Sequence, residues 1–197
     1  MKKISTILII LILAYLTLST FLFFKNEGTV FNLDQSSVIK EIKSLNRLET
    51  ASFNIEKIIE AGNDSGVFKD LLFGDKILLI AHVEVIAGFD LSNIGEEDVK
   101  ITGKKIEIKL PAPEILTTKL DNEKTRVYDR QMGILTKGDS QLESQARLAA
   151  ENSIREAACE GGILEIASIN AEKQLTVLFG SVGFDEVVIE VPGGSCS

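Results

Sequence analysis

The N-terminal region contains an uncharged apolar run from residue 4 to residue 24, preceded by Lys2 and Lys3 and followed by Lys25. As a helix, these 21 residues would span about 31 Å, which matches a hydrocarbon core about 30 Å thick. Because lipid offers the backbone no hydrogen bonds, an inserted segment must be helical. We therefore predict a single-pass anchor at residues 4–24. The lysines before it place the N-terminus in the cytoplasm and the following chain outside the cell membrane.

A cleaved signal peptide is the main alternative for this segment. The basic start of the chain fits a signal peptide, but a cleavage site with small residues is hard to find. Thr17-Leu18-Ser19 is the best candidate, yet the apolar run continues beyond it as far as Phe24. We favour the uncleaved anchor for this reason.

A long alternation of apolar and mixed positions runs from residue 77 to residue 91. Side chains of a strand point to opposite faces in turn, so this period predicts a long strand with one buried face and one partly covered face. We expect this strand to be the centre of the sheet. Its apolar odd positions are Ile77, Leu79, Ala81, Val83, Val85, Ala87, Phe89 and Leu91.

Shorter patterns on either side predict the rest of a mostly antiparallel sheet. Apolar spacing at 34–46 indicates a short amphipathic helix, and the segment from 48 to 61 indicates a strand. Alternating arms around Thr102-Gly103-Lys104 are typical of a β-hairpin. A last strand is predicted at 184–191.

A second hairpin is predicted further along the chain. Residues 115–120 form one alternating arm, and residues 125–130 form the other. Between them, Asp121-Asn122-Glu123 supplies residues that favour a turn. We therefore expect these two arms to pair with each other.

The region after Gly138 carries helical spacing and small apolar side chains. Gly161-Gly162 divides it into two helices. Because alanines allow helices to approach closely, we expect an antiparallel helical hairpin packed on the sheet. The predicted stripes are Leu142, Ala146, Ala149, Ile154 and Ala157 in the first helix, and Leu164, Ala167, Ala171, Leu175 and Leu178 in the second.

These elements predict an α+β fold with three regions. Residues 1–25 form the membrane anchor, and residues 26–47 form a stalk with the short amphipathic helix. Residues 48–197 form the extracytoplasmic domain, in which a mostly antiparallel sheet packs against the C-terminal helical hairpin. Its length of about 150 residues is usual for a single domain.

Charge narrows the classes of partner. The chain has a formal net charge of −8 and a pI of about 4.8. Nucleic-acid binding is therefore not expected, because it requires basic side chains that neutralise phosphates. From Lys25 onward there are 19 basic and 29 acidic residues, so the predicted outer domain should stand away from an anionic lipid surface.

Candidate chemistry is sparse. With one histidine and two cysteines, zinc sites are not expected, and we predict no catalytic, cofactor-binding or metal-binding residue and no cofactor. His82 and Glu84 share one face of the long predicted strand, while Asp90 and Glu114 lie at strand ends. These four side chains are candidates for lining a pocket, although structural roles explain each of them more simply.

Cys159 and Cys196 form a possible disulfide. Outside the cytoplasm such a bond is chemically allowed, and it would close a loop of 38 residues, Cys159 and Cys196 included. Whether the C-terminal tail reaches Cys159 depends on the fold, since the two Cα atoms must approach within about 7 Å.

Several short strings occur in an order that resembles a known family. They include Ala87-Gly88-Phe89-Asp90-Leu91 and Leu110-Pro111-Ala112-Pro113-Glu114-Ile115, followed by Val127-Tyr128-Asp129. In most of residues 48–191 the chain resembles the bacterial family catalogued as domain of unknown function 4230. The resemblance implies a single-pass envelope protein with one domain, and it implies no activity and no catalytic residue.

The sequence thus leads to three functional hypotheses. The first is an anchored interaction or scaffold module of the cell envelope that binds another protein or itself. The second is an envelope hydrolase that uses Asp or Glu, with or without His82. The third is a domain that binds a lipid or another small ligand. A large exposed apolar patch would support the first hypothesis.

Overall fold

The computed structural model describes residues 15, 17, 19, 35–62 and 71–196. The chain divides into two compact units, residues 1–33 and residues 34–197, and the fold below is that of the second. The predicted anchor at residues 4–24 lies almost wholly outside the described residues. Within the described part of the chain, no helix is both long enough and apolar enough to cross a bilayer.

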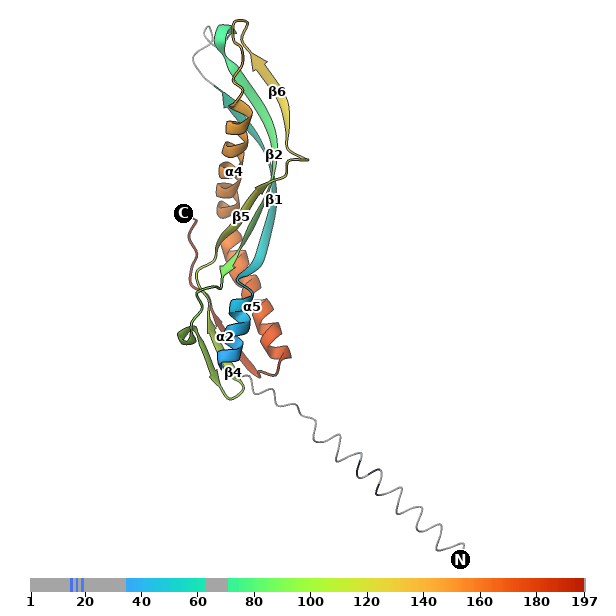
Figure 1. The fold of residues 1–197 in the computed structure, drawn as a ribbon, viewed down its shortest axis with the longest axis vertical. Helices are drawn as coiled ribbons and strands as arrows, with labels where there is room; N and C mark the ends of the chain where they lie inside the picture. The colour runs from blue at the N-terminus through green and yellow to red at the C-terminus, as the bar shows by residue number, and fades with distance from the viewer. Residues whose placement is uncertain (1–14, 16, 18, 20–34, 63–70, 197) are drawn as a thin grey trace, which may run out of the picture. The chain divides into compact units, whose positions relative to one another are not determined.

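A four-stranded antiparallel sheet forms the larger part of this unit (Figure 1). Strand β2 (Asp75–Asp90) is its centre, as predicted, and β1 (Arg47–Gly62) pairs with it along its whole length. The odd positions of β2 are buried, and most of its even positions are half-buried. This difference follows from the pleat, because the helices cover only one face of the sheet.

The predicted second hairpin is wrong. Strands β5 (Glu114–Leu120) and β6 (Arg126–Met132) both pair with β2, in succession along the edge opposite β1. The free edge of β2 is 16 residues long, and it can satisfy the backbone groups of both short strands. Alternation alone does not reveal which neighbour satisfies those groups, so the sequence suggested a local pair.

The predicted helical hairpin is also replaced by another arrangement. Helix α4 (Leu142–Glu160) and helix α5 (Ile163–Ser181) follow one another end to end along the sheet (Figure 1). Gly162 has a left-handed backbone, with φ of 76°, at the junction. A strand of 16 residues extends for about 53 Å, whereas one helix of 19 residues covers about 28 Å. Two consecutive helices are therefore needed to cover the long strands.

The hydrophobic core lies between these helices and the odd face of β2. Its helical side is built from buried apolar residues at intervals of four, and about half of them are alanine. Ala149 and Leu178, which we expected in the buried stripes, are exposed. The buried stripe of α4 is Leu142, Ala146, Ala150, Ile154 and Ala158.

A smaller sheet lies near the other end of the unit. Strands β3 (Val99–Thr102) and β4 (Lys105–Lys109) form the predicted hairpin, and β7 (Glu186–Glu190) pairs with β4 in parallel. Helix α2 (Gln35–Ser44) packs against β3 and the 3-10 helix η1 (Glu96–Asp98). The fold is therefore α+β, with two sheets and two C-terminal helices.

Candidate functional site

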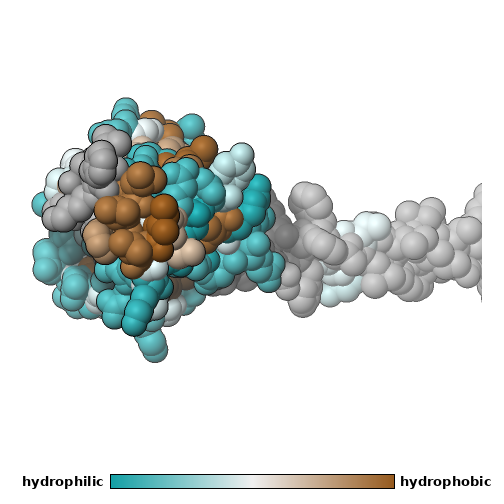
Figure 2. Space-filling model, turned by 90° about the horizontal axis from the view of Figure 1, so that it is seen from above, coloured by the Kyte–Doolittle hydropathy of each residue, from teal (hydrophilic) through white to brown (hydrophobic). Residues whose placement is uncertain are grey.

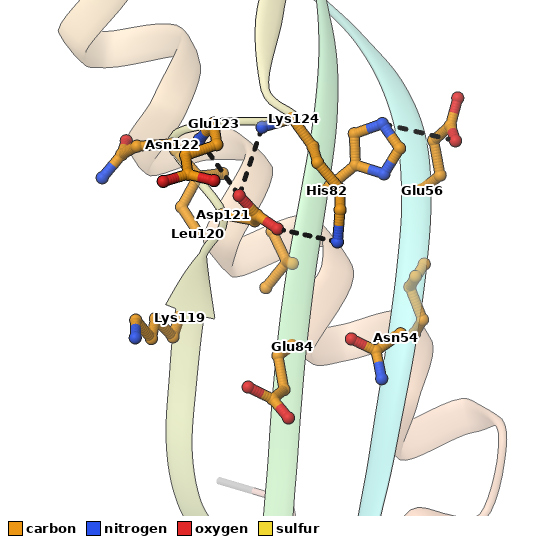
Figure 3. Close-up of a pocket in the computed structure, with 12 residues that line it drawn as sticks. Asn54, Glu56, His82, Glu84, Lys119, Leu120, Asp121, Asn122, Glu123 and Lys124 are labelled. Atoms are coloured by element: carbon orange, nitrogen blue, oxygen red, sulfur yellow. Dashed lines mark hydrogen bonds and ion pairs between the residues drawn. The ribbon is translucent and has the colours of Figure 1, made fainter.

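An open hollow of about 640 Å³ lies beside the gap between β5 and β6. Its walls come from β1, β2, the end of β5 and the connecting residues 121–124, on the face of the sheet opposite the helices (Figure 3). The lining side chains carry charges of both signs. They are Asn54, Ile55, Glu56, His82, Val83, Glu84, Lys119, Leu120, Asp121, Asn122, Glu123 and Lys124.

His82 lines this hollow from β2. Its Nε2 atom lies 3.4 Å from Oε2 of Glu56, which is directly opposite it on β1. Its backbone N–H donates to Oγ1 of Thr125 (3.1 Å), and its carbonyl accepts the N–H of Asp121 (2.8 Å). Neither β5 nor β6 pairs with β2 at His82. The segment between these two strands therefore supplies the hydrogen-bond partners of the His82 backbone N–H and carbonyl groups.

Asp121 organises the segment that joins β5 to β6. Its carboxylate accepts the backbone N–H groups of Glu123 (3.0 Å) and Lys124 (3.2 Å), and it pairs with Nζ of Lys124 at 3.0 Å. The side chain and backbone of Lys124 hold the pKa of Asp121 below its usual range, and Asp121 raises the pKa of Lys124 in return. These contacts shape the turn and occupy the Asp121 carboxylate.

The four pocket candidates from the sequence do not all meet. His82 and Glu84 line the hollow together, and Glu84 accepts a hydrogen bond from Oγ of Ser52 at 3.2 Å. Asp90 lies at the far end of β2, where its carboxylate accepts the N–H of Ser92 (3.0 Å); hydrogen bonds from Ser92 lower its pKa. Glu114 begins β5 and is exposed. Asp90 and Glu114 therefore do not line the hollow, and no hydrogen bond joins their side chains in the described structure.

The chemistry of the hollow is that of a polar surface with mixed charge. Its lining residues include no hydroxyl or thiol group that could act as a nucleophile. Over the described residues, no three His, Cys, Asp or Glu side chains are grouped so that they could hold a metal ion. The hollow could hold a small polar molecule through hydrogen bonds and ion pairs.

A second feature lies at the end of the large sheet where β2 begins and β6 ends. Here five large apolar side chains are between 56% and 77% exposed. Figure 2, which looks down on this end, shows hydrophobic residues gathered in one cluster. We call this cluster the tip patch; it consists of Leu71, Phe73, Met132, Ile134 and Leu135.

Backbone hydrogen bonds hold the two segments of the tip patch together. Gly133 donates to the carbonyl of Gly74 (2.7 Å), Ile134 to that of Leu71 (3.2 Å), and Leu135 to that of Leu72 (2.8 Å). A Cβ atom on Gly133 would lie 2.6 Å from the backbone carbon of Leu72, so only glycine permits this close approach. The apolar side chains are thus displayed from a fixed backbone.

A partly buried ion pair lies at the base of the tip patch. Asp75 accepts hydrogen bonds from Nε (3.0 Å) and Nη2 (2.7 Å) of Arg130. It also accepts the N–H of Asp139 at 2.6 Å. The Arg130 guanidinium, together with this N–H, lowers the pKa of Asp75 despite its burial. The pair ties the start of β2 to the end of β6 and to the approach of α4.

The sequence patterns did not lead us to predict the tip patch. The signal was present in Leu71-Leu72-Phe73-Gly74 and in Met132-Gly133-Ile134-Leu135, two apolar strings that each contain glycine. A loop rich in large apolar residues is unusual unless the loop is covered or binds a partner. The sequence does not show that the two strings are neighbours in space.

Comparison with known proteins gives a family and no function. No curated protein and no solved structure matches the chain. One family model matches residues 40–189, and its description is "Protein of unknown function (DUF4230)". This match extends from α2 to β7 and includes both the hollow and the tip patch. The chain therefore belongs to the DUF4230 family, as its sequence strings suggested.

Proposed function

We propose that this protein is a membrane-tethered module of the cell envelope that acts by binding, and that the tip patch is its binding surface. The observation that carries the proposal is the exposure of five adjacent large apolar side chains. Scattered apolar residues on a surface need no explanation, but a contiguous group of this size commonly marks an interaction site.

The position of the tip patch fits a tethered module. Helix α2, the first element of the described unit, packs against β3 and η1, at the end of the unit away from the tip patch (Figure 1). A membrane anchor at residues 4–24 would enter the unit through α2. The tip patch therefore lies at the opposite end of residues 34–197 from the element to which such an anchor would be joined.

The disulfide is compatible with the proposed location outside the cytoplasm. Cys159 and Cys196 are joined, with Cα atoms 6.1 Å apart. Disulfides persist mainly in oxidising compartments. The bond is therefore consistent with the proposed extracytoplasmic domain.

Site-specific photocrosslinking in living cells tests the proposed function. A photoreactive amino acid at Ile134, in the tip patch, is expected to give adducts in intact cells. The matched control is the same amino acid at Ile58, which is also exposed but lies on β1, away from the patch. Equal adduct formation at both positions, or none at Ile134, would overturn the proposal.

The hydrolase hypothesis is supported only by the meeting of His82, Glu56 and Glu84 beside one hollow. These groups resemble an acid–base set, but the lining residues include no hydroxyl or thiol nucleophile. Substituting His82 by Gln should therefore leave the function of the protein in cells unchanged. A loss of function without a loss of fold would favour the hydrolase hypothesis over binding.

A further inference from the structure

Strand β1 is the outermost strand of the large sheet, and none of the described strands pairs with its outer edge. His82 shows which backbone groups lie along that edge. Its own N–H and carbonyl bond to the segment between β5 and β6, so they point away from β1. Because Glu56 lies opposite His82 in an antiparallel pair, its N–H and carbonyl point the other way, toward the outer edge. The same alternation applies to the other even positions nearby, which are all exposed: Ser52, Asn54, Ile58 and Glu60.

The outer edge of β1 is complementary to another extended strand, because backbone donors and acceptors alternate along it. Native proteins commonly protect such an edge with proline, a bulge or a lysine. Residues 52–60 contain no proline, and the register shift of β1 precedes them, between Glu49 and Ala51. Their one lysine, Lys57, donates to Oγ of Ser153 on α4 at 2.7 Å. Its charge is therefore directed at the helix and does not block the edge.

The flank of α4 beside this edge carries only small side chains. The bond from Lys57 to Ser153 places this flank on the side of β1, whereas Arg147 on the opposite flank reaches Asn122 between β5 and β6 at 3.2 Å. Small residues let helices pack with axes about 8 to 10 Å apart. A lone peptide strand would not require such a flank, but a second copy with its own helices would. The flank consists of Ala149, Ser153, Ala157 and Gly161, all half-exposed or exposed.

Charge favours one register for two copies of β1 that pair antiparallel about a two-fold axis. When Ile55 lies on the axis, Asn54 faces Glu56 of the second copy, and Phe53 faces Lys57. Like charges directly opposite each other would destabilise such a pair, and this register contains none. The amide of Asn54 can donate to the carboxylate of Glu56, once on each side of the axis.

The neighbouring registers are less favourable. An axis at residue 56 would set Glu56 against itself, and an axis at residue 57 would set Lys57 against itself. An axis at residue 58 would oppose Glu56 and Glu60. An axis at residue 54 avoids like charges, but it shortens the regular pairing to residues 52–56, because the bulge precedes them.

We infer that two copies of this chain pair through the outer edges of their β1 strands, antiparallel, with Ile55 on the two-fold axis. The two large sheets then form one continuous sheet, with the small flanks of both α4 helices facing each other on one side. Asn54 and Glu56 also line the hollow, so the second copy contributes the same two residues to its β1 wall. This surface is separate from the tip patch, and the inference goes beyond the proposed function.

Cysteine trapping in membranes tests this register in the full chain. Two differently tagged copies are expressed in one cell, one with Asn54→Cys and the other with Glu56→Cys, and the membranes are oxidised with copper phenanthroline. Directly opposite residues have Cα atoms about 5.5 Å apart, which a disulfide can span. The matched control pairs Glu56→Cys with Ile58→Cys, two positions that face each other only when Lys57 is on the axis.

The expected result is a mixed dimer on a non-reducing gel, with a yield about fivefold higher for the first pair than for the control pair. Adding Ala157→Arg to both copies should remove this difference, because two guanidinium groups would meet between the α4 helices. Adding Asn152→Arg, on the exposed face of α4, should preserve it. Equal yields for the two cysteine pairs, no mixed dimer, or equal effects of the two arginines would overturn the inference.

This inference and the proposed function can fail separately. Ile58 faces Ser52 of the second copy, so a photoreactive amino acid at Ile58 should give an adduct of two copies of this chain. The mass of that adduct identifies it, and it does not count against the tip patch. Adducts of Ile134 with another protein, together with no mixed dimer in the cysteine experiment, would leave the proposed function standing and overturn the pairing of β1.

Discussion

Asp75 illustrates at the scale of single residues how the tip patch is supported. The residue is 5% exposed, and its carboxylate accepts two hydrogen bonds from Arg130 and one from the N–H of Asp139. Hydrogen bonds to a charged group stabilise a fold more than neutral ones do. The Arg130 side chain is one-third exposed, so water screens part of this interaction.

Replacing this carboxylate should lower stability and reduce its dependence on acid. We expect Asp75→Asn to lower the free energy of unfolding by about 1 to 2 kcal/mol at pH 7. Because folding lowers the pKa of Asp75 below 3.8, its contribution is present above the unfolded pKa and is lost as pH falls through the folded pKa. Urea unfolding from pH 7 to pH 2 should therefore show a smaller acid-induced loss in the variant.

The control for this prediction is a surface ion pair. Asp185 pairs with Lys104 at 3.2 Å, and both side chains are more than 70% exposed. Exposed pairs add little to stability, so Asp185→Asn should leave the urea midpoint unchanged at pH 7. Equal effects of the two substitutions would contradict a special role for Asp75.

The neighbours of His82 show what could be predicted for a single residue. The period of two correctly placed His82 and Glu84 on one face of a strand. The carboxylate that contacts His82, however, belongs to Glu56 on β1. This contact depends on the register between β1 and β2, which sets Glu56 opposite His82. A pattern within one strand does not contain the register of its neighbour.

At the scale of elements, helix α4 shows a similar limit. Apolar spacing predicted a helix with buried Ala146 and Ile154, and the structure buries both. It predicted Ala149 in the same stripe, where Ala150 is buried instead. Alanine occupies both positions, so composition cannot choose between them. The residues of α4 that face the large sheet are spaced four apart, and this spacing includes Ala150 and not Ala149.

Enlarging these two alanines should have opposite consequences. We expect Ala150→Leu to lower the free energy of unfolding by about 1 to 3 kcal/mol, because the side chain has no space between α4 and the sheet. Ala149→Leu should change it little, since this neighbour is exposed. Urea unfolding of both variants measures the difference. A larger loss for Ala149→Leu would show that the sheet contacts a different face of α4.

The disulfide links two elements that are distant in the sequence. Cys159 is in α4 next to its junction with α5, and Cys196 follows β7. Gly194 lies so close to Pro113 and Leu164 that a Cβ atom there would be within 3.1 Å of both. The sequence allowed this bond without deciding it, because the path of the tail depends on the parallel pairing of β7 with β4.

Removing the disulfide should destabilise the fold through the unfolded chain. Closing a loop between residues 37 positions apart stabilises a protein by about 4 kcal/mol in the chain-entropy description. We expect Cys159→Ser and Cys196→Ser each to lower the free energy of unfolding by about 3 to 4 kcal/mol, and the double substitution to add little. Reducing agent should lower the urea midpoint of the wild type and leave the variants unchanged; the reverse pattern would contradict the prediction.

At the scale of the whole molecule, the length of β2 determines much of the architecture. A strand of 16 residues needs hydrogen-bond partners along each edge and apolar side chains against its buried face. Among the described elements, only β1 is long enough to match it alone. Two short strands therefore share the edge, and two helices share the face. The sequence predicted the long strand and the two helices correctly, but it placed the partners beside each other because local pairing is the commoner arrangement.

The tether is the last property that belongs to the whole molecule. Residues 34–197 form a compact unit with its own core, whereas residues 4–24 are uncharged and apolar. We expect the full chain to remain in the membrane pellet after alkaline carbonate extraction, and a chain that begins at Asp34 to be released. Protease added to intact spheroplasts should digest the domain, while a cytoplasmic marker protein stays protected. Digestion only after lysis would reverse the orientation that the lysines at the start of the chain predict, and it would remove the tip patch from any extracellular partner.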